Sequence, residues 1–319
     1  MVNPYLTIVV PIYNELDNLE PLYQRLTGTL DQVGKPYEIL LVNDGSQDGS
    51  YFLLNTLQKK RPKQIRVIHF SGNFGQHMAV MAGFEQARGQ IIITLDADLQ
   101  NLPEEIPSLM ALIEQGHDYV GGVRKQRHDS LFRRYASKLN NWLRYKLTDI
   151  RLSDQGCMFR AYHCSLIQLM VASKETSLFI PAQAYSLAQK PIEIEVGHAA
   201  RGAGHSKYNL YRLLRLNFDL MTGFSLLPLQ LFTMVGMLIS ILSSLFVGYM
   251  LIRRVMIGPE AEGVFTLFAI LFFLMGISLM GLGILGEYIG RIYQEVRQRP
   301  RYIIKEIKEE QPSQDKAHV

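Results

Sequence analysis

The hydrophobic positions of the N-terminal third of the chain follow a repeating pattern. Short apolar runs with many β-branched residues alternate with segments in which apolar residues recur at helical spacing; the runs are LTIVV, ILLV, IRVIHF and IIITL. Strands that alternate with helices over about 100 residues indicate a parallel, doubly wound α/β sheet with right-handed crossovers. We therefore predict an α/β domain over residues 1–225.

The C-terminal third has a different pattern. No charged residue occurs between Leu220 and Ile252, or between Gly263 and Gly286. Each stretch is longer than the roughly 20 apolar residues that cross a bilayer. We predict a membrane domain over residues 226–290, with transmembrane helices at about 228–252 and 264–287, rather than two buried helices of a soluble core.

The residues after the second span, 291–319, are rich in Arg and Lys and are predicted to form a basic tail. Two spans leave both ends of the chain on one side of the membrane. The positive-inside rule then places the tail and the α/β domain in the cytoplasm, although Arg253 and Arg254 between the spans weaken this assignment.

Two further segments have a basic face beside an apolar face. One lies near residues 130–147 and includes Trp142; the other, near 206–222, runs into the first span. Such helices are typical of the membrane interface, although solvated surface helices are the alternative. Arg124 and Arg133, close to the first of them, have the side-chain type that best binds phosphate.

The chemistry is concentrated in the polar turns that follow the predicted strands. Asp96 and Asp98 follow the fourth strand directly, and Gln100 comes two residues later. In open α/β sheets ligands bind at the carboxyl ends of the strands, and paired carboxylates with substrate phosphates suit Mg²⁺ or Mn²⁺. Taken alone, this D-x-D pattern is more often a simple polar turn.

Two earlier turns should lie at the same edge of the sheet. Tyr13 could stack on a nucleotide base, and Asp44 could accept hydrogen bonds from a base or ribose. The sequence has neither a G-x-G-x-x-G after its first strand nor a P-loop, so phosphates would be held by a metal at Asp98.

The remaining candidates are weaker individually. Asp154 lies in a Gly-containing turn, and Arg201, His205, Ser206 and Lys207 lie in a predicted loop. A hydrolytic triad is unsupported because no G-x-S-x-G motif supplies a nucleophile. The two cysteines indicate neither a disulfide framework nor a zinc site, and a net charge of +4 over 319 residues gives no indication of a nucleic-acid partner.

Seven stretches in order resemble one family: PIYNE, NDGSQDGS, NFGQHMAVMAGF, TLDADLQNLPEEIP, SDQGCMFRAY, GHSKYNLYRL and GLGILGEYIGRIYQEVRQRPRY. Together they resemble the polyprenyl-phosphate glycosyltransferases of the dolichyl-phosphate mannose synthase type, in glycosyltransferase family 2. The resemblance covers residues 7–302 and implies the nucleotide-diphospho-sugar transferase (GT-A) fold with inverting chemistry. Within the family, GQHMAVMAGF, DQGCMFRAY and AEGVFTLFAI resemble the bacterial enzymes that transfer 4-deoxy-4-formamido-L-arabinose to undecaprenyl phosphate for lipid A modification.

The resemblance also implies roles for individual residues. The nucleotide would be held by Pro11, Tyr13, Glu15, Asp44 and Asp96; the metal by Asp96, Asp98 and Gln100; and the acceptor or diphosphate phosphates by Arg124, Arg133, Ser137, Arg201 and Lys207. Asp154 matches the catalytic position.

The implied partners are a nucleotide-sugar donor, undecaprenyl phosphate and the bacterial inner membrane, and glycines such as Gly276 and Gly281 would allow close helix approach in a homo-oligomer. His205 departs from the acidic residue of the finer pattern, and the loop Gly202–Gly204 is small. An undecaprenyl-phosphate glucosyl- or mannosyltransferase, a processive polysaccharide synthase and a non-catalytic nucleotide-sugar-binding scaffold are the alternatives.

Overall fold

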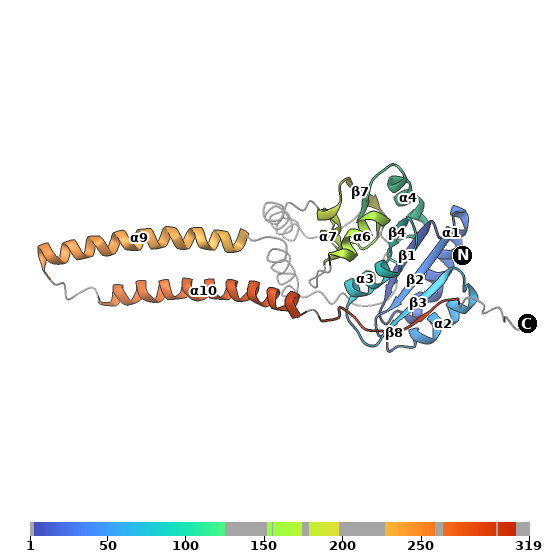
Figure 1. Cartoon of the computed structure of the whole chain (residues 1–319), viewed down its shortest axis with the longest axis horizontal. Helices are drawn as coiled ribbons and strands as arrows, with labels where there is room; N and C mark the ends of the chain where they lie inside the picture. Colours follow the sequence, from blue (N-terminus) through green and yellow to red (C-terminus); the bar gives the residue numbers. More distant parts are fainter. Residues whose placement is uncertain are drawn as a thin grey trace, which may run out of the picture. The chain divides into compact units, whose positions relative to one another are not determined.

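The computed structural model describes residues 3–124, 152–154, 156–173, 179–197, 227–258, 264–297 and 299–310 (Figure 1). The chain divides into two compact units. An α/β unit comprises residues 1–137, 150–207 and 299–319, and a helical unit comprises residues 138–149 and 208–298.

The α/β unit is built on one mixed sheet. Within the described residues it has eight strands in the order β7-β5-β6-β4-β1-β2-β3-β8. The strands are β1 (Leu6–Ile12), β2 (Tyr37–Asn43), β3 (Ile65–Phe70), β4 (Ile91–Thr94), β5 (Tyr119–Arg124), β6 (Arg160–His163), β7 (Pro191–Val196) and β8 (Ile304–Lys308). β1 pairs in parallel with β2 and β4, and β2 with β3, whereas β6 runs antiparallel to β4 and β5 and β8 antiparallel to β3.

Helices cover both faces of the sheet. On one face of the sheet, α3 contacts β1, α6 contacts β4, and α7 lies beside α6 (Figure 1). On the other face, α2 and α4 contact strands, and α1 packs on α2. The central strands are buried on both faces, which explains why their sequences are continuous apolar runs instead of alternating ones. The helices are α1 (Leu16–Val33), α2 (Ser50–Lys60), α3 (Gln76–Gln86), the short 3₁₀ helix η1 (Pro103–Glu105), α4 (Ile106–Glu114), α6 (Cys164–Ala172) and α7 (Ile180–Leu187).

The predicted α/β sheet is confirmed, but it is mixed and not wholly parallel, because β6 and β8 run antiparallel to their neighbours. The C-terminal segment differs from a simple basic tail. Residues up to Arg297 continue the last helix of the helical unit, and residues 304–308 return to the α/β unit as the edge strand β8.

β8 is anchored at its start by aromatic and backbone contacts. Tyr302 stacks on Phe70 with ring centroids 4.9 Å apart and 11° between their planes, and its hydroxyl bonds Glu85. The amide of Ser71 donates to the carbonyl of Ile303 at 2.9 Å. These contacts attach the strand to the end of β3.

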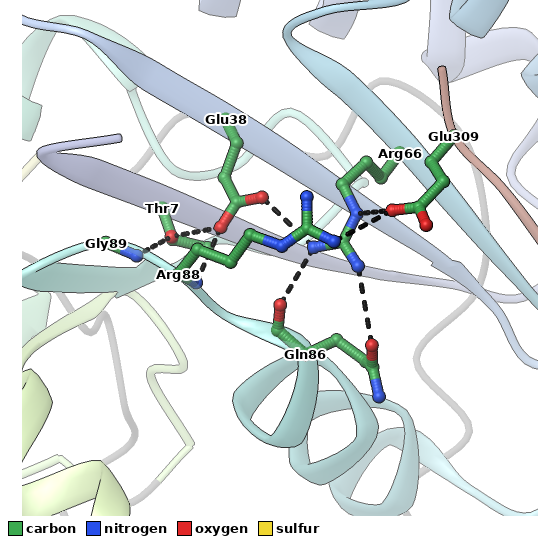
Figure 2. Close-up of polar contacts among 7 residues, drawn as sticks. All are labelled: Thr7, Glu38, Arg66, Gln86, Arg88, Gly89 and Glu309. Carbon is green, nitrogen blue, oxygen red and sulfur yellow. Dashed lines mark hydrogen bonds and ion pairs between the residues drawn. The ribbon is translucent and has the colours of Figure 1, made fainter. Parts of the chain in front are cut away.

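Glu309, just after β8, is anchored by charge (Figure 2). One of its carboxylate oxygens accepts from Arg66 Nε and from Arg88 Nη2, both at 2.9 Å. Arg66 is buried and also donates to Glu38 Oε2 at 3.1 Å and to the carbonyl of Gln86 at 2.8 Å. Buried charges are tolerated when they are paired and hydrogen-bonded in this way, so the cluster fixes the C-terminal segment to the starts of β2 and β3.

The helical unit contains two long helices, α9 (Leu227–Ile257) and α10 (Val264–Arg297), at the two positions where spans were predicted. Within the described residues one stretch is long and apolar enough to cross a membrane, Ile270–Gly290 of α10, whereas the apolar stretch Leu229–Ile239 of α9 is shorter. A second membrane span therefore stays a prediction. Gly281 on α10 allows close packing against α9, because a Cβ at this position would lie 2.2 Å from the ring of Phe232.

The two predicted interfacial helices, near 130–147 and 206–222, lie outside the described residues.

Candidate active site

Polar turns from six strands meet at one edge of the sheet. Because β1, β2, β3 and β4 are parallel, the segments that follow them lie at the same edge. β5 also ends there, at Arg124, and β6 begins there because it is antiparallel to both β4 and β5. This edge collects the predicted site residues that the structure describes: Pro11, Tyr13, Glu15, Asp44, Asp96, Asp98, Gln100, Arg124 and Asp154.

The turns after β1 and β2 are tied to each other. Asn14 has a left-handed φ of 55°, and its side-chain oxygen accepts from the amide of Gln47 at 2.8 Å while its own amide donates to Ser46 Oγ at 3.0 Å. Asp48 accepts from the amide of Leu16 at 3.0 Å. Tyr13 is 47% exposed beside this junction, so its ring is available to a ligand, whereas Pro11 is buried within β1.

Asp44 organises the next loop along the edge. Its two carboxylate oxygens accept from the amides of Phe74 and Gly75, at 2.6 and 2.9 Å, and the side chain is buried. Burial raises its pKa and the two amide bonds oppose that rise. Gly45 has a φ of +70° and allows the loop after β2 to approach the loop at Gly72 closely. A Cβ on Gly45 would lie 2.5 Å from the backbone of Gly72. Asp44 therefore sets the position of the loop that leads into α3.

The first residue of α3 reaches the D-x-D motif. Gln76 Nε2 donates to Asp96 Oδ1 at 2.6 Å. Burial, followed by the negative charge of Asp98 and, more weakly, of Glu15, raises the pKa of Asp96 to about 7, although Arg124 and Gln76 oppose the rise. Glu15, Asp96, Asp98 and Arg124 thus lie within one electrostatic environment.

The D-x-D turn fits a divalent cation chemically. Asp98 Oδ1 accepts from the amide of Gln100 at 3.1 Å, and Leu99 between them has a left-handed φ of 61°, which is uncommon outside glycine. Carboxylates that repel one another, to the extent seen at Asp96, are the donors that Mg²⁺ and Mn²⁺ take. Among the described residues, no group of three His, Cys, Asp or Glu side chains could hold a metal.

Asp154 and Arg124 form a forked ion pair. Arg124 Nε donates to Asp154 Oδ2 at 2.6 Å and Nη2 donates to Oδ1 at 2.8 Å. The amide of Gly156 donates to Oδ1 at 3.1 Å, and a side chain on Gly156 would lie 2.8 Å from Arg124 Nη2. The ion pair with Asp154 raises the pKa of Arg124, so its charge is permanent. A predicted catalytic carboxylate and a predicted phosphate ligand are therefore direct partners.

Arg133, Ser137, Arg201, His205 and Lys207 lie outside the described residues. Gln76 was not predicted as a site residue, although it lies in the quoted stretch NFGQHMAVMAGF. Nor was Glu105, whose carboxylate accepts from the amide of Gly197 at 2.9 and 3.0 Å at the end of β7. The quoted stretch TLDADLQNLPEEIP contained this residue, but no signal linked it to a segment so far along the chain.

Comparison with known proteins identifies the family. Residues 7–175 match the model of "Glycosyl transferase family 2". The chain belongs to glycosyl transferase family 2. Within this family it is 46% identical over 305 residues to the undecaprenyl-phosphate 4-deoxy-4-formamido-L-arabinose transferase of Edwardsiella ictaluri, covering 95% of this chain and 94% of that protein. It is 46% identical over 303 residues to the enzyme of the same name from Aeromonas hydrophila, covering 94% of this chain and 93% of that protein.

Solved structures with similar folds are much more distant in sequence. Glucosyl-3-phosphoglycerate synthase from Mycobacterium tuberculosis, in complex with Mn²⁺, UDP-glucose and phosphoglyceric acid, matches with a TM-score of 0.49 and 15% identity, covering 69% of this chain and 78% of that one. Mannosyl-3-phosphoglycerate synthase from Rubrobacter xylanophilus matches with a TM-score of 0.47 and 13% identity, covering 68% and 71%. The assignment of this chain to its family rests on sequence.

Proposed function

We propose that this family 2 protein transfers 4-deoxy-4-formamido-L-arabinose from its uridine-diphosphate donor to undecaprenyl phosphate, with inversion at the sugar, in lipid A modification. The observation that carries the proposal is the similarity at 46% identity to transferases of that name, over 95% of the chain. The carboxylates and the arginine gathered at one sheet edge are the groups that such a reaction requires.

The reaction breaks one bond and forms another. An oxygen of the lipid phosphate attacks the anomeric carbon, a new C–O bond forms, and the bond to the donor diphosphate breaks with its electrons leaving on the nucleoside diphosphate. A phosphate monoester has its second pKa at about 6, so at neutral pH the acceptor is largely a dianion and needs no base. Asp154 is therefore assigned to positioning and to stabilising positive charge on the sugar ring.

The other predicted site residues are proposed to bind the donor and the acceptor. Tyr13 offers an exposed ring to the base, and Asp44 holds the loop beside it. Arg124 offsets the repulsion between Asp154 and an incoming phosphate dianion. Arg133, Ser137, Arg201 and Lys207 are proposed to bind the acceptor phosphate and the donor diphosphate.

A divalent cation, Mg²⁺ or Mn²⁺, is proposed to bind Asp96 and Asp98 with help from Gln100. When bound, it would neutralise the charge that develops on the leaving diphosphate. Gln76 holds one oxygen of Asp96, which leaves the other oxygen for a ligand. Burial and then the negative charge of Asp98 raise the pKa of Asp96, and a bound cation would favour its charged form.

The acceptor has a long isoprenoid chain, so we also propose an inner-membrane location with the α/β unit facing the cytoplasm. Large exposed apolar side chains on both α9 and α10 support contact with lipid, Leu238 and Phe273 being examples. Residues 1–225 with 299–310 would form the catalytic part, and the spans would hold it next to the acceptor. Self-association of the spans remains part of this proposal.

The test uses purified full-length protein in detergent, undecaprenyl phosphate, Mn²⁺ and a panel of UDP-sugars and GDP-sugars. Release of nucleoside diphosphate from UDP-4-deoxy-4-formamido-L-arabinose only when lipid is present supports the proposal. Faster lipid-dependent release from UDP-glucose or GDP-mannose would replace the sugar and keep the reaction class. No release from any donor would overturn the enzymatic proposal in favour of a binding role.

A further inference from the structure

Arg160 is a buried cation in the α/β unit that the proposed reaction does not use. Its side chain is the largest of those with no exposed surface. Among the described residues its hydrogen-bond partners are neutral oxygens: Nε donates to the carbonyl of Cys157 at 2.6 Å, Nη2 to the carbonyl of Asp154 at 2.5 Å, and Nη1 to the hydroxyl of Tyr119. Burying a charge without a carboxylate is costly, which suggests that the arrangement serves more than stability.

Two of these partners belong to the turn that carries Asp154. The guanidinium of Arg160 is rigid and bonds this turn at two points. One nitrogen donates to the carbonyl of Asp154, and another donates to the carbonyl of Cys157. The same turn is held from neighbouring strands, since Thr94 Oγ1 donates to the carbonyl of Met158 and the amide of Gly122 donates to that of Phe159 at 3.1 Å. The backbone around Asp154 is therefore fixed on several sides.

The neighbouring strands leave room for the guanidinium. Arg160 pairs with Gly121 on β5, and a Cβ on that glycine would lie 3.2 Å from Arg160 Nη1. On its other side Arg160 pairs with Thr94 on β4, two residues before Asp96. Arg160 thus contacts the turn of Asp154 through its side chain and pairs through its backbone with the strand that leads into the D-x-D motif.

We infer that Arg160 is a positioning residue that fixes the Asp154 turn, so that the Asp154 carboxylate meets Arg124 at the sheet edge that also carries the D-x-D motif. It acts through the main-chain carbonyls of Asp154 and Cys157 and does not touch the substrate. The effect on turnover rests on the proposed function, whereas the effect on the turn itself does not.

The experiment compares Arg160→Met and Arg160→Lys with Arg66→Met in full-length protein. Arg66 is the matched control because it is also a buried arginine of the same sheet, but it lies near the start of β3, at the edge opposite the site. Hydrogen–deuterium exchange of peptides covering 152–160 reports the turn without requiring activity. Turnover of donor with undecaprenyl phosphate gives kcat and KM.

Arg160→Met is expected to speed exchange at 152–160 and to lower kcat by about 10- to 100-fold, with donor KM changed less than about threefold, because small displacements of a reacting group cost rate. Arg160→Lys keeps the positive charge but loses the forked donors of the guanidinium, so its kcat is expected to lie between those of Arg160→Met and the wild-type protein. Arg66→Met should lower thermal stability while leaving exchange at 152–160 and kcat of the folded protein unchanged. If Arg160→Met does not fold, Tyr119→Phe removes one acceptor of Arg160 and should produce the same local change in exchange, reduced in size.

Exchange at 152–160 that stays at the wild-type rate in Arg160→Met would overturn the inference, as would an equal loss of kcat in Arg66→Met. If the wild-type protein transfers no sugar, the proposed function fails, and the exchange comparison alone then decides whether Arg160 fixes the turn.

Discussion

Arg124 donates to both carboxylate oxygens of Asp154, from Nε at 2.6 Å and from Nη2 at 2.8 Å, and so joins the end of β5 to the turn before β6. A carboxylate held this way is stabilised in its charged form and has its two oxygens fixed in direction. It is better suited to orient a substrate, or to face positive charge on a sugar, than to remove a proton.

Asp154→Asn should lower kcat on the order of 100-fold with little change in donor KM, because the amide cannot accept both bonds from Arg124 and carries no charge to stabilise the reacting sugar. The measurement is lipid-dependent release of nucleoside diphosphate. Asp118→Asn is the control, because Asp118 also accepts two bonds, from the amides of Gln189 and Lys190, but lies outside the site. Full turnover in Asp154→Asn would remove the assigned role.

Gly45→Ala should weaken both stability and donor binding. Gly45 and Gly34 both have a left-handed φ, of +70° and +68°, but a Cβ meets the backbone of Gly72 only at Gly45, since nothing lies within 4 Å of Gly34. Gly34→Ala should cost about 1–2 kcal/mol from backbone strain alone. Gly45→Ala should cost about 1–3 kcal/mol more, because the loop held by Asp44 must move. Chemical denaturation and donor KM measure the two effects, and equal costs for the two variants would contradict the close packing of these loops.

The stability of the α/β unit should depend on pH through buried histidine. Burial lowers the pKa of His69 to about 4 from 6.5, while Asn43 and Asn55 bond its ring nitrogens at 3.0 and 3.2 Å. The unfolded chain therefore binds the proton more tightly than the folded chain, so stability is complete above about pH 6.5 and is lost as the pH falls towards 4. His69 alone should contribute a slope of about 1.4 kcal/mol per pH unit in this window.

His69→Gln should remove that contribution to the slope in denaturation series between pH 4 and 7. Part of the slope should remain, because burial also lowers the pKa of His77 to about 4. An identical pH dependence in wild-type protein and His69→Gln would show that His69 does not titrate as its surroundings indicate.

Glu38→Gln should destabilise the protein by about 3 kcal/mol. Glu38 Oε2 pairs with Arg66, while Oε1 accepts from Thr7 Oγ1 and the amide of Arg88, both at 2.7 Å (Figure 2). Removing Glu38 leaves the buried guanidinium of Arg66 with only the partly exposed Glu309 as a carboxylate partner among the described residues, which compensates its charge less well. Glu20→Gln breaks an exposed pair with Lys60 at 2.9 Å and should cost less than about 1 kcal/mol. Denaturant titration distinguishes the two, and similar costs would contradict the buried character of the Glu38 pair.

Removal of divalent cations should abolish turnover, and Mn²⁺ or Mg²⁺ should restore it. The proposed cation would relieve the repulsion between Asp96 and Asp98, so Asp98→Ala should lose turnover at every Mn²⁺ concentration while keeping its fold. Electron paramagnetic resonance of Mn²⁺ titrated with UDP gives a readout that does not depend on activity. A fully chelated protein with normal turnover would exclude this use of the D-x-D motif.

Much of this arrangement could be predicted from the sequence because it depends on strand order. Once β4 is a buried parallel strand, Asp96 and Asp98 must lie at the edge where ligands bind. Asp154 was predicted from its motif and Arg124 from its residue type and the family resemblance, but their pairing was not predicted, since it depends on β6 running antiparallel between β4 and β5. Nothing local in the sequence encodes that register.

Other features were missed because their sequences suggest a different environment. The strand β8 reads IKEIK, and such mixed charge is equally typical of a solvated tail and of a protected edge strand. Arg160 is surrounded by apolar residues in the chain, but a charged side chain is expected at the surface unless the structure supplies its partners. The inferred role of Arg160 depends on the carbonyls of Asp154 and Cys157 that it binds, and the sequence does not show these contacts.

The pairing of β3 with β8 has a consequence for biosynthesis. β3 is made early, whereas β8 emerges from the ribosome only after α9 and α10 have been synthesised. The outer edge of β3 therefore stays open while α9 and α10 are being synthesised, and an open edge can recruit foreign strands. Because β3 gains its outer neighbour only after both long helices have been made, we expect the nascent chain to need chaperones that keep this edge from pairing with other chains.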